Sequence, residues 1–86
     1  MTTSKGNNPE RWGALLAVLD EKLQLGLLEY LKRVRSYHFE EEILYIQPGS
    51  PEDERYLRKG AVSQQLELLA QDAIGIEKVK LEKVAE

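Results

Sequence analysis

Residues 36–50, SYHFEEEILYIQPGS, contain the point where the hydrophobic pattern changes from helical to alternating. Tyr37 and Phe39 alternate with polar residues, and alternation with a period of two predicts a strand. Leu44 and Ile46 alternate in the same way and predict a second strand. Three glutamates separate the two strands, which predicts a β-hairpin. The turn lacks the usual glycine or asparagine, so its type stays open.

Two helices are predicted on the N-terminal side of the hairpin. Apolar residues spaced three and four apart predict an amphipathic helix over residues 9–22, with Asn8 as its cap and Pro9 in its first turn. Gly26 marks a break, and a second helix is predicted over about 25–35. The side chains expected to face inward are those of Trp12, Leu15, Leu16, Leu19, Leu23, Leu27, Leu28, Leu31 and Val34.

A helix and a strand are predicted on the C-terminal side. Ser50 is a helix cap followed by a proline and three acidic residues, which predicts a helix over residues 51–74. The phase of its apolar residues shifts around Gly60, so we expect a kink or a division there. Gly75 is a suitable C-terminal cap, and the alternating sequence after it predicts a strand near 77–83.

The resulting order, α-α-β-β-α-β, predicts an α+β fold with helices packed on a three-stranded sheet, and it resembles a KH-like unit. Residues 1–8 are predicted to be a disordered lead or linker, residues 9–83 a single domain and residues 84–86 a tail. The polar residues of the strands are expected to line an open sheet face, and these are His38, Tyr45, Lys78 and Lys80.

Length and composition restrict the classes of protein to consider. The chain has 86 residues, enough for one domain. Its net charge of −3 argues against a dedicated non-specific nucleic-acid binder. It has no cysteine, which excludes a disulfide, a thiolate nucleophile and a zinc–thiolate site and is typical of the cytoplasm, where we expect it. It lacks an apolar run long enough to span a membrane and a secretory signal, so no membrane association is expected.

The residue patterns of enzymes and metal sites are missing, which predicts a non-catalytic domain without a cofactor or a metal. His38 is the single histidine and cannot form a multi-histidine site. The acidic run at residues 40–42 lacks the spacing and the glycine of a calcium loop, and we interpret it as a solvated hairpin tip. The sequence also lacks a phosphate-binding glycine loop and a nucleophile elbow.

Two groups of basic residues are candidates for partner binding. One falls in the last turn of the second predicted helix and the other lies in the third predicted helix, and together they are Lys32, Arg33 and Arg35, and Arg55, Arg58 and Lys59. One interpretation is ordinary charge at helix ends and on helix surfaces. The other is a patch that meets an acidic protein or a phosphate backbone, which requires the two groups to lie close together in space.

The chain resembles the small domain near the C-terminus of the gamma/tau subunit of bacterial DNA polymerase III, the clamp loader. It resembles the N-terminal domain of the replication initiator DnaA almost as closely. The resemblance covers about residues 9–83 and is carried by the tryptophan of the first helix and by LLEYLKRV, ILYI and AIGIEKVKLE. The long link QPGSPEDERYLRKG favours the gamma/tau family, whereas the Glu-Glu hairpin turn departs from the glycine-containing turn of many relatives.

The resemblance implies a non-catalytic module that docks other replication proteins. For gamma/tau these are the polymerase subunit or the replicative helicase, and for the initiator they are the helicase, regulators or another copy. The nucleotide-clamping G-x-x-G loop of true KH domains is absent. Neither family's motif fixes a binding residue, so no such residue is transferred to this chain.

Three hypotheses for function follow. The first is a protein-interaction module of the bacterial replication machinery. The second is a nucleic-acid-binding module that uses the basic helix ends and Tyr37 or Tyr45. The third is self-association through a free sheet edge. Trp12 is interpreted as a core residue, with a partner-binding role at the edge of its helix face as the alternative.

Overall fold

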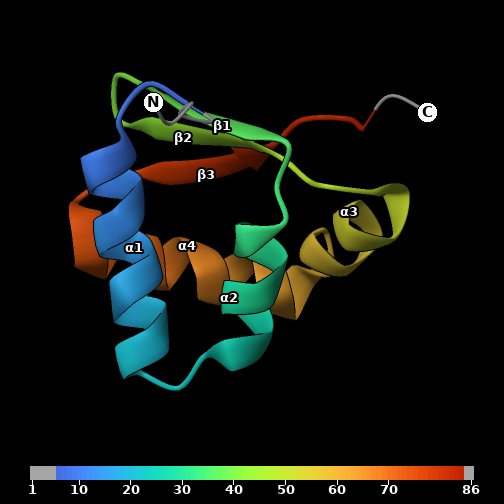
Figure 1. The fold of residues 1–86 in the computed structure, drawn as a ribbon, viewed down its shortest axis with the longest axis horizontal. Coiled ribbons are helices and arrows are strands. Elements are labelled where there is room, and N and C mark those ends of the chain that lie inside the picture. The colour runs from blue at the N-terminus through green and yellow to red at the C-terminus, as the bar shows by residue number, and fades with distance from the viewer. Residues whose placement is uncertain (1–5, 85–86) are drawn as a thin grey trace, which may run out of the picture.

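The computed structural model describes residues 6–84 as an α+β sandwich (Figure 1). The elements are α1 (Pro9–Glu21), α2 (Leu25–Lys32), β1 (Ser36–Glu40), β2 (Ile43–Gln47), α3 (Pro51–Leu57), α4 (Gly60–Ile74) and β3 (Lys78–Leu81). The helices lie together on one side of the sheet, and within residues 6–84 no helix covers its other face. The predicted fold class and element order are confirmed, with the third predicted helix divided into α3 and α4 just before Gly60.

The sheet has β2 at its centre. β1 runs antiparallel to β2, with Tyr37 opposite Ile46, and β3 runs parallel to β2, with Val79 opposite Leu44. The strand residues on the helix side alternate with those on the open side, which are polar apart from Ile43, as the period of two predicts. The parallel pairing of β2 and β3 needs a long crossover, which α3 and α4 supply.

An aromatic stack joins the first helix to the sheet. The rings of Trp12 and Tyr37 lie 4.3 Å apart between centroids and 6° from parallel. Only 7% of the Trp12 surface is exposed, and the residue belongs to the same core cluster as Leu15 and Leu19. The structure therefore agrees with the core interpretation of Trp12, and a partner would reach only the exposed remainder.

Both ends of the described chain are more involved in the fold than the sequence predicts. Asn7, expected in the disordered lead, donates from its side chain to the Phe39 carbonyl and accepts from the Phe39 N–H, each at 2.8 Å. Asn8 caps α1 as predicted. Val84, expected in the tail, is buried and donates its N–H to Glu54 at 3.1 Å. The remaining residues of the predicted lead and tail, 1–5 and 85–86, lie outside the described residues.

The second helix is shorter than its predicted range of 25–35. It ends at Lys32, and Arg33 occupies its C-cap. Helix formation stops there because the sheet takes over the backbone, with the Arg35 N–H donating to the Gln47 carbonyl at 2.9 Å. Arg33 and Arg35 are therefore not in the last turn of a helix. A Cβ atom at Gly49 would collide with the Arg33 carbonyl, so this link requires a glycine.

The hairpin turn contains a strained residue. Residues 41 and 42 connect the paired positions Glu40 and Ile43, and Glu41 has a φ of 56°. A positive φ at the first of two central residues is the type II′ pattern, which favours glycine at that position. A side chain in the left-handed region costs about 1–2 kcal/mol.

Replacing this strained glutamate should stabilise the protein. We expect Glu41→Gly to raise the free energy of unfolding by about 1 kcal/mol, because glycine adopts a positive φ without steric cost but loses more backbone entropy on folding. Urea unfolding of both proteins measures the difference. Glu41→Ala removes the same carboxylate without relieving the backbone, and a gain of equal size in this variant would contradict the explanation.

The stack of Trp12 on Tyr37 predicts a graded loss of stability. Trp12→Ala should lower the free energy of unfolding by about 3–5 kcal/mol, as is typical when a large core side chain is truncated. Trp12→Phe keeps a ring against Tyr37 and should cost less. Chemical denaturation measures both variants, and equal losses in the two would show that the stacked ring itself contributes nothing.

Candidate protein-docking surface

One member of each predicted basic group, Arg33 and Lys59, lies where α2 approaches α3. Arg33 forms a two-point ion pair with the buried Asp53, from Nε to Oδ2 at 3.1 Å and from Nη2 to Oδ1 at 3.0 Å. Asp53 lies in the first turn of α3, and its hydrogen bond and charge raise the pKa of Arg33. The ion pair thus holds the end of α2 against the beginning of α3.

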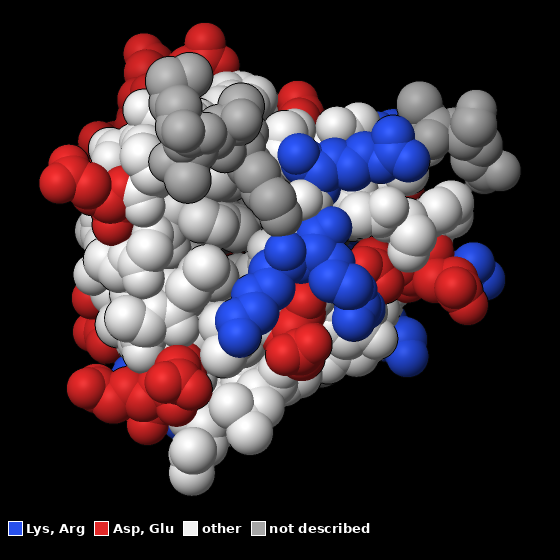
Figure 2. All heavy atoms as spheres, in the orientation of Figure 1, with Lys and Arg blue, Asp and Glu red and all other residues white. Residues whose placement is uncertain are grey.

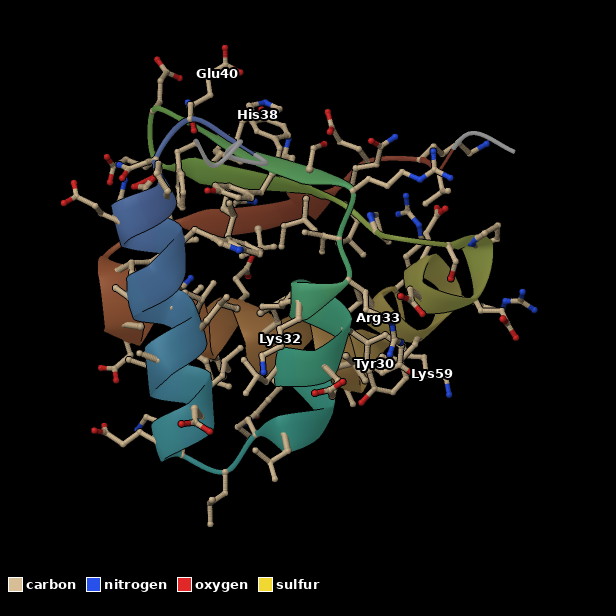
Figure 3. The ribbon with its side chains drawn as sticks, in the orientation of Figure 1. Tyr30, Lys32, Arg33, His38, Glu40 and Lys59 are labelled. Carbon is tan, nitrogen blue, oxygen red and sulfur yellow. The ribbon has the colours of Figure 1, made fainter. Side chains whose placement is uncertain are left out.

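Two tyrosines extend this contact into a stack of cations and rings. The Arg33 guanidinium lies 4.6 Å from the centroid of Tyr30, whose ring stacks on Tyr56 at 4.1 Å. The Lys59 ammonium lies 5.7 Å from the Tyr56 ring. Figure 3 shows Tyr30, Arg33 and Lys59 on the side of α2 that faces α3. We call Arg33, Tyr30, Tyr56 and Lys59 the cation–tyrosine stack.

The other predicted basic residues have different surroundings. Arg58 donates to Glu54 at 2.7 Å and to the Leu81 carbonyl at 3.3 Å, so it ties α3 to β3. Lys32 lies on the opposite side of α2 from Arg33 (Figure 3). Arg35 and Arg55 are exposed. Arg33 and Lys59 are thus the two members that the structure brings together around one cluster of rings.

The link between α1 and α2 exposes two leucines, one of which the helical period predicts to face inward. Leu23 was expected to face inward, but α1 ends at Glu21 and the chain turns, leaving 77% of Leu23 exposed with a φ of 59°. Leu25, at the beginning of α2, is 52% exposed. The break predicted near Gly26 is the feature of the sequence that indicates that the apolar face of the first helix ends before Leu23.

A shallow hollow lies beside these leucines. Its volume is about 300 Å³, and its lining residues are Gln24, Leu27, Tyr56, Ala61, Val62 and Gln65. Gln24 stands between the two exposed leucines in the chain, and Tyr56 belongs to the cation–tyrosine stack. We call Leu23, Leu25 and the hollow the corner surface. It offers apolar contact, and Lys59 lies against the Tyr56 ring that lines the hollow.

Backbone N–H and C=O groups at both edges of the sheet already form hydrogen bonds with side chains. On β1, the Phe39 main chain is bonded to the Asn7 side chain. On β3, the Val79 N–H donates to Glu67 at 3.1 Å and the Leu81 carbonyl accepts from Arg58. Side chains that occupy edge groups oppose pairing with another strand. Self-association through an edge stays a prediction, and these contacts oppose it.

Two further features concern the described residues alone. Residues 6–84 contain no cluster of three or more histidine or acidic side chains placed to hold a metal ion. No helix within the same range has the length and apolar character needed to cross a membrane.

The contact between α3 and the end of the chain should weaken in acid. The pKa of Glu54 is lowered chiefly by the hydrogen bond from Arg58 and then by the Val84 N–H. A carboxylate with a lowered pKa stabilises the fold above its unfolded pKa of 4.5, and that stability is lost as pH falls through the folded value. The stability difference between wild type and Glu54→Gln should therefore be larger at pH 7 than at pH 3.

Urea unfolding at both pH values measures this difference. Glu52→Gln, at an exposed position of the same helix, controls for the loss of one negative charge near the start of α3. A stability difference for Glu54→Gln that stays constant between pH 7 and pH 3 would contradict the assignment.

Comparison with known proteins gives no match by sequence or by structure. No protein-family model matches the chain, and no curated protein and no solved structure is detectably similar to it.

Proposed function

We propose that this chain is a non-catalytic protein-interaction module whose corner surface binds an apolar, acidic segment of another protein. The observation that carries the proposal is the exposure of Leu23 and Leu25 beside a hollow walled by Tyr56. Leu23 adopts the left-handed conformation that ends α1 in a Schellman motif, in which the Gln24 N–H donates to the Leu19 carbonyl at 2.8 Å and the Leu23 N–H to the Asp20 carbonyl at 3.1 Å, and this cap holds the Leu23 side chain outside the core.

The chemistry of the surface indicates the kind of segment it would hold. A hollow of about 300 Å³ accommodates one or two apolar side chains. Leu23 and Leu25 would contact the neighbouring apolar side chains of the bound segment. An amphipathic helix docks in this way, through residues spaced three or four apart. Lys59 beside the hollow favours an acidic residue at the edge of that segment.

The cellular setting is proposed from the resemblance to the gamma/tau and initiator domains. On that ground the partner is a polymerase subunit or the replicative helicase of bacteria, and the compartment is the cytoplasm. The confirmed order of helices and strands agrees with this setting, but the choice of replication rests on the resemblance alone.

Nucleic-acid binding is the second candidate. The observation in its favour is the gathering of basic side chains seen on one face of the molecule, over the α2 and α3 region, although acidic side chains lie among them (Figure 2). Arg33 and Arg58 already hold carboxylates, which reduces their attraction for phosphate. Tyr37 is buried in the core, and Tyr45 belongs to the open sheet face, away from the helices.

The corner surface predicts a selective effect of one leucine substitution. Purified replicative polymerase subunit and helicase are each titrated into the fluorescently labelled chain. Leu25→Ser should weaken binding about tenfold, because a leucine that becomes buried on binding contributes at least 1.5 kcal/mol. Leu68→Ser is the matched control, since Leu68 is exposed to a similar extent, at 56%, but lies on α4 and is not part of the corner surface.

Three outcomes would count against this assignment. Binding of neither protein contradicts the replication setting. Equal weakening by the two leucine substitutions contradicts the corner surface as the site. Binding to a single-stranded oligonucleotide that falls steeply with salt, and weakens further in Arg55→Ala and Arg58→Ala, would instead support the second candidate.

A further inference from the structure

The open face of the sheet presents an ordered array of side chains. The strand register places Glu40, Ile43 and Lys78 in one row across the three strands. The same register places His38, Tyr45 and Lys80 in the next row. A third row contains Ser36 and Gln47, with Glu82 following on the β3 side. Figure 3 shows His38 and Glu40 pointing away from the helices.

The side chains at the centre of this face hold one another in place. The rings of His38 and Tyr45 stack at 4.6 Å and 10° from parallel. Ser36 donates to the Gln47 side chain at 3.4 Å, and Gln47 donates to the Lys83 carbonyl at 3.3 Å. A face whose side chains are already ordered loses little entropy when it is covered.

Charge is distributed unequally between the two sides of the face. β1 carries Glu40, β3 carries Lys78 and Lys80, and β2 between them carries Ile43 and Tyr45. Counted together with Glu82, the face holds two acidic and two basic residues. It therefore has no excess charge to attract a phosphate backbone. The stacked rings of His38 and Tyr45 also cover one face of each other, which leaves less ring surface for a base.

We propose that this open face binds a second copy of the chain, face to face, about a two-fold axis parallel to β2. That rotation keeps the rows aligned and lays β1 of each copy over β3 of the other. Glu40 of one copy then meets Lys78 of the other, and symmetry repeats this ion pair. Ile43 and Tyr45 meet their own counterparts at the centre, as residues do between packed sheets.

The distribution of charge selects this axis over the other in-plane choice. A two-fold axis perpendicular to the strands would lay each strand over its own copy. Lys80 would then face Lys80 and Glu40 would face Ser36, while Lys78 would face Glu82, so this axis sets a contact between like charges against its ion pairs. Like charges in direct opposition are unfavourable, whereas the axis parallel to β2 keeps the lysines of the two copies on opposite sides.

The size of the face indicates a weak dimer. Three strands that lie about 4.8 Å apart and are each about five residues long cover roughly 250 Å². This figure leaves out the additional surface area of the side chains. Stable interfaces bury about 800 Å² on each partner. The dimer should therefore form at high protein concentration and dissociate on dilution.

Charge reversal on the two sides of the face tests the arrangement. Sedimentation equilibrium of the full chain at concentrations up to about 1 mM measures the dimer dissociation constant. Glu40→Lys and Lys78→Glu should each weaken the dimer roughly tenfold or more, since each substitution creates two like-charge contacts. The double variant Glu40→Lys/Lys78→Glu should restore dimerisation, because both ion pairs return with their signs exchanged.

Glu21→Lys makes the same charge change at an exposed position at the end of α1 and should leave the dimer unchanged. A chain that stays monomeric at about 1 mM overturns the proposal, as does a dimer that is unaffected by the single reversals. Failure of the double variant to recover overturns this axis. Amide NMR shifts at His38 and Tyr45 that follow an added single-stranded oligonucleotide rather than chain concentration would assign the face to nucleic acid instead.

Discussion

The stack of Trp12 on Tyr37 is the contact on which the rest of the structure depends, because it fixes the helix layer to the sheet. Phe39 meets the edge of Tyr37 at 6.0 Å, and Arg11 lies over the Phe39 ring at 5.1 Å. Arg11 also donates two hydrogen bonds, at 2.7 and 3.2 Å, to the Ile74 carbonyl at the end of α4. The aromatic cluster and one arginine thus join α1, β1 and α4, segments far apart in the chain.

The second anchor of the fold is electrostatic and lies at the other end of the helix layer. The Asp53 N–H donates a hydrogen bond to the Ser50 hydroxyl oxygen, while the Asp53 carboxylate accepts two from Arg33. A buried carboxylate is tolerated only when it is paired, so Arg33 is required to neutralise Asp53. The same arginine covers Tyr30, which places the cation–tyrosine stack beside the hollow. Structural and binding roles therefore overlap on this side of the molecule.

The corner surface and the open sheet face lie at opposite ends of the molecule. Figure 1 shows the link between α1 and α2 at the end of the helix layer that is far from the sheet. A dimer formed through the sheets would direct its two corner surfaces outward, so that both remain available. Two linked sites bind a multivalent partner more tightly than one, without any new contact. The two proposals are thus compatible, although each has its own test.

Local structure follows from the sequence alone, because hydrophobic period, caps and breaks act over a few residues. The sequence predicted the class, the order of elements, the caps Asn8, Ser50 and Gly75 and the division near Gly60. Contacts between side chains that are distant in the sequence depend on the tertiary fold. The pairing of Arg33 with Asp53, the hold of Asn7 on β1 and the exposure of Leu23 depend on where the chain turns and which distant segment it then contacts. A periodic pattern assigns a residue to one face of a helix, but packing between distant segments decides whether that face is covered.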